Sequence, residues 1–285
     1  MNHASTMSTP DRYAVYGHPI RHSQSPRIHG LFAEQTGQSL TYTAEDVEPG
    51  AFEPSVKDFF GQGGRGLNCT VPLKELAFQL ADTLSDRARC AKAVNTLALR
   101  EDGSIHGDNT DGVGLLRDLT ENLGIAISGQ RLLILGAGGA TRGILAPLLE
   151  HSPARITVAN RTTSKALQLA QEFQPLGPVD GCGLEDIAGL SFDLILNATA
   201  ASLSGELPAL PEGLLAAGGC CYDLAYARAP TPFVRWGISV GARLSVDGIG
   251  MLVEQAAEAF MLWRGVRPRT APVIALLQAE RQVPE

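Results

Sequence analysis

The sequence lacks a concentrated basic segment. Its 285 residues include 23 lysines and arginines against 30 aspartates and glutamates, which gives a formal net charge of −7. Proteins that bind nucleic acid need a basic face to neutralise phosphate groups, and many of them interleave aromatic and basic residues. Neither pattern occurs in this chain. The composition therefore argues against nucleic acid as the main partner.

Cysteines are few, and their arrangement is not typical of a disulfide framework or a zinc site. The set is odd in number, is scattered, contains no CxxC pair, and consists of Cys69, Cys90, Cys182, Cys220 and Cys221. His18 and His22 are four residues apart, but Pro19 breaks any helix that would align them as metal ligands. We therefore expect no metal and no disulfide framework, and we expect a reducing cytoplasm as the compartment.

Long apolar runs are absent as well. No stretch approaches the roughly 18 apolar residues that a membrane-spanning helix needs. The N-terminus, MNHASTMSTP, is polar and lacks the apolar region of a signal peptide. Internal repeats and low-complexity linkers are also missing, whereas hydrophobic residues make up 44% of the chain. These features predict a protein with a substantial core and no membrane contact, long enough for two domains.

The pattern of predicted elements changes along the chain. Strands and helices alternate irregularly in the first third, whereas strand–helix units recur regularly from residue 131, which is typical of a parallel sheet with helices on both faces. The predicted strands are 13–17, 40–47, 65–71, 93–99, 105–110, 131–135, 155–159, 192–199, 220–226 and 242–246. The predicted helices include 25–37 (with Ser25 as N-cap and Gly37 past its end), 52–60, one that begins at Pro72, 111–124, 248–265 and 271–280.

The two final helices have no strand left to cover. We therefore expect them to fold back on the first part of the chain. This predicts an α/β protein of two domains with a cleft between them. Residues 1–110 and 248–285 would form one domain, and residues 111–247 would form a Rossmann-type domain with a parallel sheet.

A glycine-rich turn lies at the start of the regular part. The sequence LLILGAGGATRG places Gly136, Gly138 and Gly139 between a buried strand and a helix. Glycines at such a turn let the backbone approach a pyrophosphate at the helix N-terminus. Thr141 replaces the third glycine of the usual G-x-G-x-x-G pattern, and an ordinary tight turn remains the alternative. The β-α-β context favours dinucleotide binding.

The following strand ends in ANRTTSK and carries no carboxylate. NAD sites usually have an acidic residue there to hold the ribose 2′-OH. Arg161 and Lys165 are four residues apart and could both face a 2′-phosphate, to which Thr162 would add a hydroxyl. Solvent-exposed charges are the alternative, but a helix start is an unfavourable place for a cation. The segment therefore favours NADP over NAD.

Lys74 raises a similar question. If Pro72 is the first residue of a helix, Lys74 lies in its first turn, where the helix macrodipole disfavours a cation. The lysine is either an incidental surface residue or a group used for proton transfer.

Further polar residues stand in positions that suggest a ligand. Ser23 and Ser25 precede a helix and could hold a carboxylate. Asn68 and Asn95 interrupt apolar strands, need hydrogen-bond partners, and could face a polyol. Asp111, in GDNTDG, could equally be a helix cap.

The joint pattern resembles the shikimate dehydrogenase family. The segments HSQSPRIH, NCTVPLK, AVNTL, GDNTDG, GAGGATR, NRT, NAT, YDLAY and DGIGMLVEQAA occur in the family's order and approximate spacing, from about Tyr13 to the C-terminal helix. The resemblance implies an enzyme that reversibly reduces 3-dehydroshikimate to shikimate with NADP(H), in the biosynthesis of chorismate and aromatic amino acids. A cytoplasmic monomer or homodimer with a small-molecule substrate is implied.

The resemblance also implies the site residues. Lys74 and Asp111 match the catalytic pair. The substrate site would contain these two residues together with Ser23, Ser25, Asn68, Thr70, Asn95, Tyr226 and Gln255. The cofactor site would contain Gly136, Ala137, Gly138, Gly139, Ala140, Asn160, Arg161, Thr162, Lys165, Ala198, Thr199, Leu224 and Gly248.

Two departures from the family pattern bear on the cofactor site. NATAASL replaces the usual NATS and glycine-containing turn, so the sequence does not determine the conformation of residues 198–203. Leu224 stands where methionine is usual, a swap that conserves volume. An NAD-dependent quinate/shikimate dehydrogenase and a non-catalytic dinucleotide-binding regulator are the alternatives. Arg161 argues against the first, and retention of Lys74 and Asp111 argues against the second.

Overall fold

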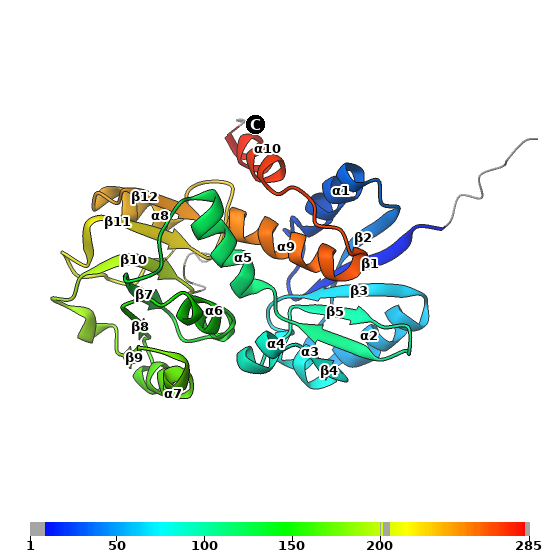
Figure 1. Cartoon of the computed structure of the whole chain (residues 1–285), viewed down its shortest axis with the longest axis horizontal. Coiled ribbons are helices and arrows are strands. Elements are labelled where there is room, and N and C mark those ends of the chain that lie inside the picture. Colours follow the sequence, from blue (N-terminus) through cyan, green and yellow to red (C-terminus); the bar gives the residue numbers. More distant parts are fainter. Residues whose placement is uncertain (1–8, 200, 202–205, 283–285) are drawn as a thin grey trace, which may run out of the picture.

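The structure is a computed structural model that describes residues 9–199, 201 and 206–282. Two six-stranded sheets lie side by side, and the helices α5 (Asp111–Arg117) and α9 (Ile249–Arg264) run between them (Figure 1). The segment 198–203 lies only partly within the described residues.

The first sheet is mixed. Its strands are β1 (Asp11–Gly17), β2 (Leu40–Asp46), β3 (Gly64–Cys69), β4 (Thr83–Leu84), β5 (Thr96–Leu99) and β6 (Ile105–Asp108). They follow the order β2-β1-β3-β5-β6-β4, with β5 and β6 as the predicted antiparallel hairpin. The register of β3 against β5 sets Asn68 opposite Thr96. Asn68 therefore lies on β3, next to the start of β5, which Asn95 directly precedes.

The second sheet is entirely parallel. Its strands are β7 (Arg131–Leu135), β8 (Arg155–Ala159), β9 (Val179–Cys182), β10 (Phe192–Asn197), β11 (Leu215–Asp223) and β12 (Leu244–Asp247). They follow the order β12-β11-β10-β7-β8-β9. The apolar sequence RLLIL of β7 is buried from Leu132 onward, as expected for a strand covered on both faces. This confirms the predicted Rossmann-type sheet. Two strands were not predicted, β9 in this sheet and β4 in the first.

The helices cover the sheets and connect them. They are α1 (Ser25–Thr36), α2 (Phe52–Gly61), α3 (Lys74–Leu80), α4 (Asp86–Ala91), α5, α6 (Gly139–Glu150), α7 (Thr163–Phe173), α8 (Pro232–Ser239), α9 and α10 (Ala271–Gln282). A π-helical turn, η2 (Asp118–Asn122), continues α5, and the 3₁₀ turns are η1 (Pro49–Ala51), η3 (Gln174–Leu176) and η4 (Glu185–Ile187). In the described part of the chain, no helix has both the length and the apolar character needed to span a membrane.

Two predicted helix starts are wrong. The N-cap of α1 is Gln24, and Ser25 is the first helical residue, whose N–H donates to Ser23 Oγ at 3.3 Å. Pro72 lies in a turn before α3, closed by a hydrogen bond from Leu73 N to Thr70 O at 2.8 Å. Lys74 is therefore the first residue of α3, which still places it in the first turn. Gly37 ends α1 with a φ of 65°, as predicted.

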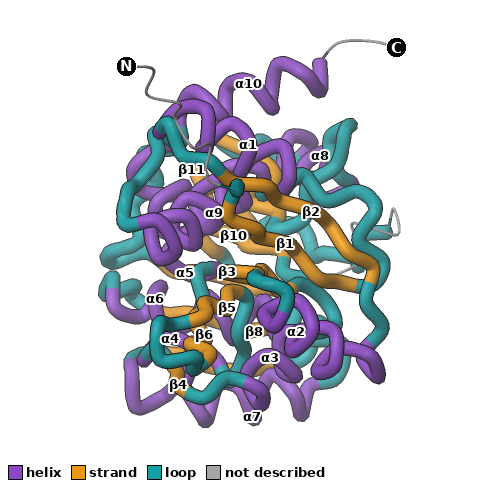
Figure 2. The backbone as a smooth tube through the Cα atoms, turned by 90° about the vertical axis from the view of Figure 1, so that its right-hand side faces the viewer, coloured by secondary structure: helices purple, strands orange, loops and turns teal. Residues whose placement is uncertain are grey.

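The C-terminal helices pack against the first sheet and α1. Phe260 of α9 lies 5.8 Å from Phe32 of α1, measured between ring centroids, and Trp263 Nε1 donates to Leu97 O of β5 at 3.0 Å. α10 joins the same apolar cluster through Val273 and other residues. Figure 2 shows its backbone next to α1. The domain boundaries predicted from the sequence remain a prediction. That prediction assigned the two C-terminal helices to the first domain, and these contacts support that assignment.

Candidate active site

Lys74 and Asp111 meet between the two sheets. The Nζ of Lys74 lies 2.5 Å from Oδ2 of Asp111, and the exposed fractions of the two side chains are 20% and 3%. Each residue begins a helix, α3 or α5, and the N-cap of α5 is Thr110 rather than Asp111. The carboxylate of Asp111 is therefore not used as a cap. It offsets the unfavourable position of the Lys74 cation at a helix start.

Asn95 fixes the orientation of this pair. Its Nδ2 donates to Asp111 Oδ1 at 2.8 Å and to Gln255 Oε1 of α9 at 3.1 Å. Its Oδ1 accepts the N–H of Thr110 at 2.9 Å and the hydroxyl of Thr96 at 2.9 Å. Because Asn95 is 4% exposed and uses both ends of its amide, it has one stable orientation.

Asn68 extends the network toward β2. Its Nδ2 donates to Asn95 O at 3.1 Å and to Thr96 Oγ1 at 3.0 Å, and its Oδ1 accepts the hydroxyl of Tyr42 at 2.7 Å. Burial raises the pKa of Tyr42 well above its usual value, so its hydroxyl stays protonated and donates. His29 stacks on Tyr42 with a centroid distance of 4.2 Å, and burial lowers the pKa of this histidine to about 3.

The remaining residues predicted for the substrate site surround the start of α1 and the turn before α3. Burial raises the pKa of Tyr226, and a hydrogen bond with the backbone of Gln24, the residue between Ser23 and Ser25 in the sequence, acts in the opposite direction. Thr70 donates its N–H to Tyr16 O at 2.9 Å and begins the turn that leads to Lys74.

The glycine turn lies beside this network. Gly136 has a φ of 103°, which only glycine adopts easily, and the Thr141 hydroxyl donates to Gly136 O at 2.7 Å. Thr141 therefore closes the turn at the position of the missing third glycine. Further along α6, a Cβ added to Gly143 would lie 3.3 Å from Asp111 Oδ2. The helix that begins at the glycine turn thus runs directly against the Asp111 carboxylate.

The other residues predicted for the cofactor lie where the parallel strands end. Asn160, Ala198 and Leu224 follow β8, β10 and β11 directly, and Thr199 is tied to Asn197 Oδ1 by its hydroxyl at 2.7 Å. Gly248 follows β12, and its N–H donates to Ala225 O at 3.1 Å. Open α/β sheets bind ligands at this carboxyl edge.

Arg161, Thr162 and Lys165 are exposed at the start of α7. Asn160 Nδ2 donates to Thr162 O at 3.0 Å and shapes the turn before the helix. Within residues 9–199, 201 and 206–282, the side chains of Arg161 and Lys165 make no hydrogen bond or ion pair. They are therefore available to an anion outside the chain.

Comparisons with known proteins agree with this geometry. The profile of the shikimate dehydrogenase substrate binding domain matches residues 15–97, that of shikimate / quinate 5-dehydrogenase matches 118–204, and that of the shikimate 5′-dehydrogenase C-terminal domain matches 248–278. The shikimate dehydrogenase (NADP(+)) of Methylococcus capsulatus is 69% identical over 276 residues, which cover 97% of this chain and 99% of the relative. The chain belongs to the shikimate dehydrogenase family.

Solved structures with the same fold include members of this family. An Ael1 enzyme from Pseudomonas putida aligns with a TM-score of 0.86 and 47% identity, over 96% of this chain and 99% of that one. Shikimate 5-dehydrogenase from Thermus thermophilus, in complex with NADP(H) and shikimate, aligns with a TM-score of 0.84 and 35% identity, over 96% and 100%. The family and the fold class predicted from the sequence are confirmed.

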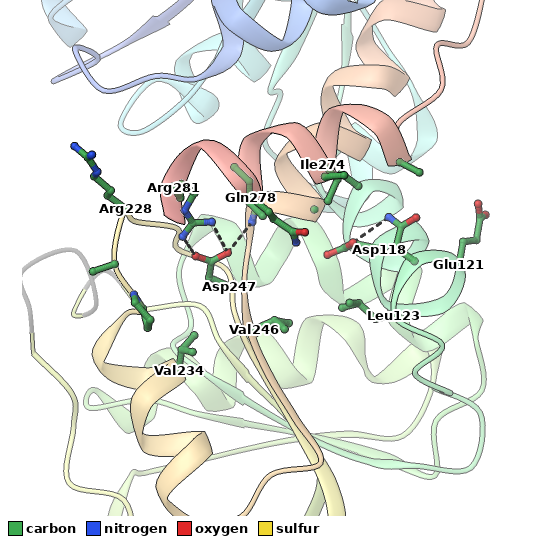
Figure 3. Close-up of a pocket in the computed structure, with 17 residues that line it drawn as sticks. Asp118, Glu121, Leu123, Arg228, Val234, Val246, Asp247, Ile274, Gln278 and Arg281 are labelled. Carbon is green, nitrogen blue, oxygen red and sulfur yellow. Dashed lines mark hydrogen bonds and ion pairs between the residues drawn. The ribbon is translucent and has the colours of Figure 1, made fainter. Parts of the chain in front are cut away.

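A cavity of about 1300 Å³ has Asp247 and Ile249, the sequence neighbours of Gly248, among its lining residues (Figure 3). α10, β12 and η2 line it, with the ion pair of Asp247 and Arg281 on one side and Asp118 on the other. None of the residues that line it was predicted for the substrate or the cofactor. Among the described residues, no group of three or more His, Cys, Asp or Glu side chains could hold a metal ion.

Sequence reasoning missed three members of the network: Tyr42, Thr96 and Thr110. Tyr42 lies between Thr41 and Thr43 on a predicted strand, and Thr96 and Thr110 lie beside Asn95 and Asp111 in the sequence. Their position next to predicted site residues was a signal, but their partners become visible only when the strands are paired.

Proposed function

We propose that this member of the shikimate dehydrogenase family catalyses the reversible, NADPH-dependent reduction of 3-dehydroshikimate to shikimate. The observation that carries the proposal is the 2.5 Å contact between Lys74 Nζ and Asp111 Oδ2, held by Asn95 and lying against α6. The name of the Methylococcus relative and the ligands of the Thermus structure support the same reaction. The product is used in the biosynthesis of chorismate and aromatic amino acids.

Lys74 acts as the general acid of the reduction. NADPH, when bound, supplies the hydride. Negative charge then develops on the substrate oxygen, which must be protonated. Lys74 carries a proton on Nζ and donates it to this oxygen, and Asp111 orients the ammonium group through Oδ2 while Asn95 holds Oδ1 at 2.8 Å. In the reverse direction Lys74 accepts the proton of the hydroxyl.

Polar side chains around the pair bind the rest of the substrate. The hydroxyls of Ser23, Ser25 and Tyr226, at the N-terminus of the twelve-residue helix α1, bind the carboxylate. Asn68, Thr70, Asn95, Asp111 and Gln255 bind the ring hydroxyls. Because Asn68 and Asn95 are oriented by internal hydrogen bonds, the site recognises hydroxyl groups in a fixed arrangement rather than adapting to them.

The carboxyl edge of the second sheet fits NADP. A Cβ added to Gly138 or Gly139 would meet no protein atom within 4 Å, so the backbone at the start of α6 is open to a pyrophosphate. Arg161, Thr162 and Lys165 bind the 2′-phosphate, with Asn160 shaping the turn before them. Ala198, Thr199, Leu224 and Gly248 line the nicotinamide end.

The chain divides accordingly into two functional domains. We assign residues 1–110 and 248–285 to the substrate-binding domain and residues 111–247 to the NADP-binding domain. The contacts of Phe260 and Trp263 with α1 and β5 support the assignment of the C-terminal helices. The five cysteines are free, which suits the reducing cytoplasm that we propose as the compartment.

An absorbance assay at the NADPH band tests the reaction and the cofactor together. Shikimate and quinate are each offered with NADP and with NAD at fixed ionic strength. We expect shikimate with NADP to be used far better than any other combination. Preference for NAD, or for quinate, would contradict the proposal.

A further inference from the structure

An ion pair between half-buried Arg87 and buried Asp108 lies next to residues 109–111, the turn that leads into Asp111. Asp108, the last residue of β6, is 3% exposed and is separated from Asp111 by two residues. Arg87 of α4 binds its carboxylate with two parallel contacts, Nε to Oδ1 at 2.7 Å and Nη2 to Oδ2 at 2.5 Å. Ser85, the N-cap of α4, donates its hydroxyl to Oδ1 at 2.5 Å. The carboxylate is thus fixed from two sides by the start of one helix.

The Asp108 carboxylate is joined to Asp111 by a short chain of hydrogen bonds. Asp108 Oδ1 accepts the N–H of Asn109 at 2.7 Å, and Asn109 Oδ1 accepts the N–H of Asp111 at 3.1 Å. The backbone oxygen of Asp108 also accepts the N–H of Asn95 at 3.0 Å. The same aspartate therefore sets the backbone position of Asp111 and of the asparagine that orients it.

Arg87 has a third contact, which leads to the other side of the substrate site. Its Nη1 donates to Glu258 Oε1 of α9 at 3.1 Å. Glu258 lies one helical turn after Gln255, whose side chain accepts from Asn95 at 3.1 Å. Arg267 binds the second oxygen of Glu258 at 2.7 Å, so this carboxylate is held as well. One guanidinium group thus connects the Asp111 turn with the helix that carries Gln255.

We propose that Arg87 is a positioning residue for the reaction, which holds the Asp111 turn and α9 in register so that Lys74, Asp111 and Gln255 meet the substrate together. The inference rests on the proposed function. A planar guanidinium with a forked set of donors suits this role because it fixes direction as well as distance. Reactions of this kind are sensitive to placement, since an error of about 1 Å can cost roughly 10²-fold in rate.

The variant that tests this role is Arg87→Lys, which keeps the charge and loses the fork. We expect kcat for shikimate oxidation to fall by about 10-fold, while KM for NADP changes by less than about threefold, because the displaced groups act on the chemical step. The matched control is Arg89→Lys on the same helix, where the arginine is 57% exposed and pairs with the fully exposed Asp86. It should leave kcat within about twofold of the wild-type value.

A second variant covers the case in which Arg87→Lys folds poorly. Asp108→Asn removes the buried charge, keeps an oxygen for the Asn109 N–H, and leaves Arg87 paired with Glu258. We expect the same selective fall in kcat. If both variants fold and keep kcat within about twofold of the wild type, or if Arg89→Lys causes an equal loss, Arg87 does not position the site.

Hydrogen exchange measured by mass spectrometry provides a readout that does not depend on the substrate. Amides of residues 109–111 should exchange at least about 10-fold faster in Arg87→Lys than in the wild type or in Arg89→Lys, because the turn opens locally more often. Unchanged exchange would overturn the inference. The wild-type protein could instead lack NADP-dependent activity on shikimate while Arg87→Lys still exchanges faster than the other two proteins. That result would count against the proposed function alone.

Discussion

The substrate side and the cofactor side of this molecule are built differently. On the substrate side, hydrogen bonds join Asn68 to Asn95 and Asn95 to Asp111, and both Asn95 and Asp111 are buried. On the cofactor side, Arg161 and Lys165 are exposed and, in the described part of the chain, make no polar contact. A buried network keeps its geometry before a ligand arrives, whereas exposed cations contribute to binding mainly by attracting an anionic ligand. Substitutions on the first side should therefore change the chemical step, and those on the second side should change affinity.

The largest effect should come from Lys74→Ala. We expect kcat to fall by roughly 10²–10⁴-fold, because a general acid is lost, while KM for NADP stays nearly constant. Steady-state kinetics with both substrates varied measure this split. Lys57→Ala, which removes an exposed lysine paired with Glu53 on the same side of the molecule, serves as the control and should keep full activity. If Lys74→Ala raised KM for NADP by as large a factor as it lowered kcat, the substrate side would not act selectively on the chemical step.

Arg161→Ala should give the next largest effect, on affinity. A guanidinium can bind the 2′-phosphate through charge-assisted hydrogen bonds worth about 1.5–3 kcal/mol, so KM for NADP should rise by on the order of 10- to 100-fold. Turnover at saturating NADP and the weak use of NAD should hardly change. Lys165→Ala should raise KM for NADP by less, because the lysine ammonium group is carried on a flexible side chain and is strongly hydrated.

Arg155→Ala is the matched control for that experiment. Arg155 stands at the opposite end of β8 and pairs with Asp180, so its removal should leave both cofactors unaffected. Kinetics for NADP and NAD should be measured at one ionic strength, because salt screens the effect. An equal loss for NADP and NAD in Arg161→Ala would show that the residue does not bind the 2′-phosphate.

A smaller effect is expected for Tyr42→Phe. The change removes the 2.7 Å hydrogen bond to Asn68 and leaves the stacking on His29 intact. Loss of one buried hydrogen bond costs about 1 kcal/mol, so KM for shikimate should rise by about 3- to 10-fold. Tyr16→Phe is the control, since within the described residues the Tyr16 hydroxyl makes one hydrogen bond, a long one of 3.4 Å to Ser55 O. If the two variants behave alike, Tyr42 does not orient Asn68.

The smallest effect concerns an ion pair that connects the two sides. Hydrogen bonds from Arg142 and then Lys92 lower the pKa of Glu172 to about 2, below its ordinary value of 4.5. A depressed carboxyl pKa stabilises the folded state at neutral pH, and this contribution is lost as the pH falls from about 5 toward 2. Glu172 is 26% exposed, so we expect Glu172→Gln to lower the free energy of unfolding at pH 7 by on the order of 1 kcal/mol.

Thermal unfolding between pH 7 and pH 3 measures this contribution. The difference between the wild type and Glu172→Gln should shrink as the pH falls. Glu121→Gln, in an exposed pair with Arg117 on one helical segment, should change little at any pH. A difference for Glu172→Gln that stays constant down to pH 3 would contradict the assigned role of the ion pair.

The same contrast explains what could be predicted from the sequence. The glycine turn was predictable because it lies in a short segment whose local pattern, strand then turn then helix, already defines its surroundings, and the role proposed for Arg161 rests on the same kind of local pattern. The network around Asn95 joins residues from β2, β3, β5, α5 and α9. Asn68 and Asn95 were noted in the sequence as polar residues inside apolar strands, but Gln255 was found only through the family resemblance, and Tyr42 was missed. Arg87 was missed for the same reason, because α4 was not predicted and its partners are Asp108 and Glu258.

The errors at helix starts have a different cause. Serine and proline are frequent both in the first turn of a helix and in the turn that precedes it, so propensity cannot separate the two positions. At Pro72 the separation is made by the hydrogen bond from Leu73 N to Thr70 O, and at Ser25 by the contact of its N–H with Ser23. Lys74 was nevertheless placed correctly in the first turn.

The measurement that tests the account most directly is a double-mutant cycle on Lys74 and Asp111. kcat is measured for the wild type, Lys74→Ala, Asp111→Asn and the double variant, all at saturating shikimate and NADP. If the two residues act as one unit across their 2.5 Å contact, the double variant should be little worse than the worse single variant. Losses that multiply, so that the double variant shows the product of the two single effects, would contradict the pairing on which the proposed mechanism rests.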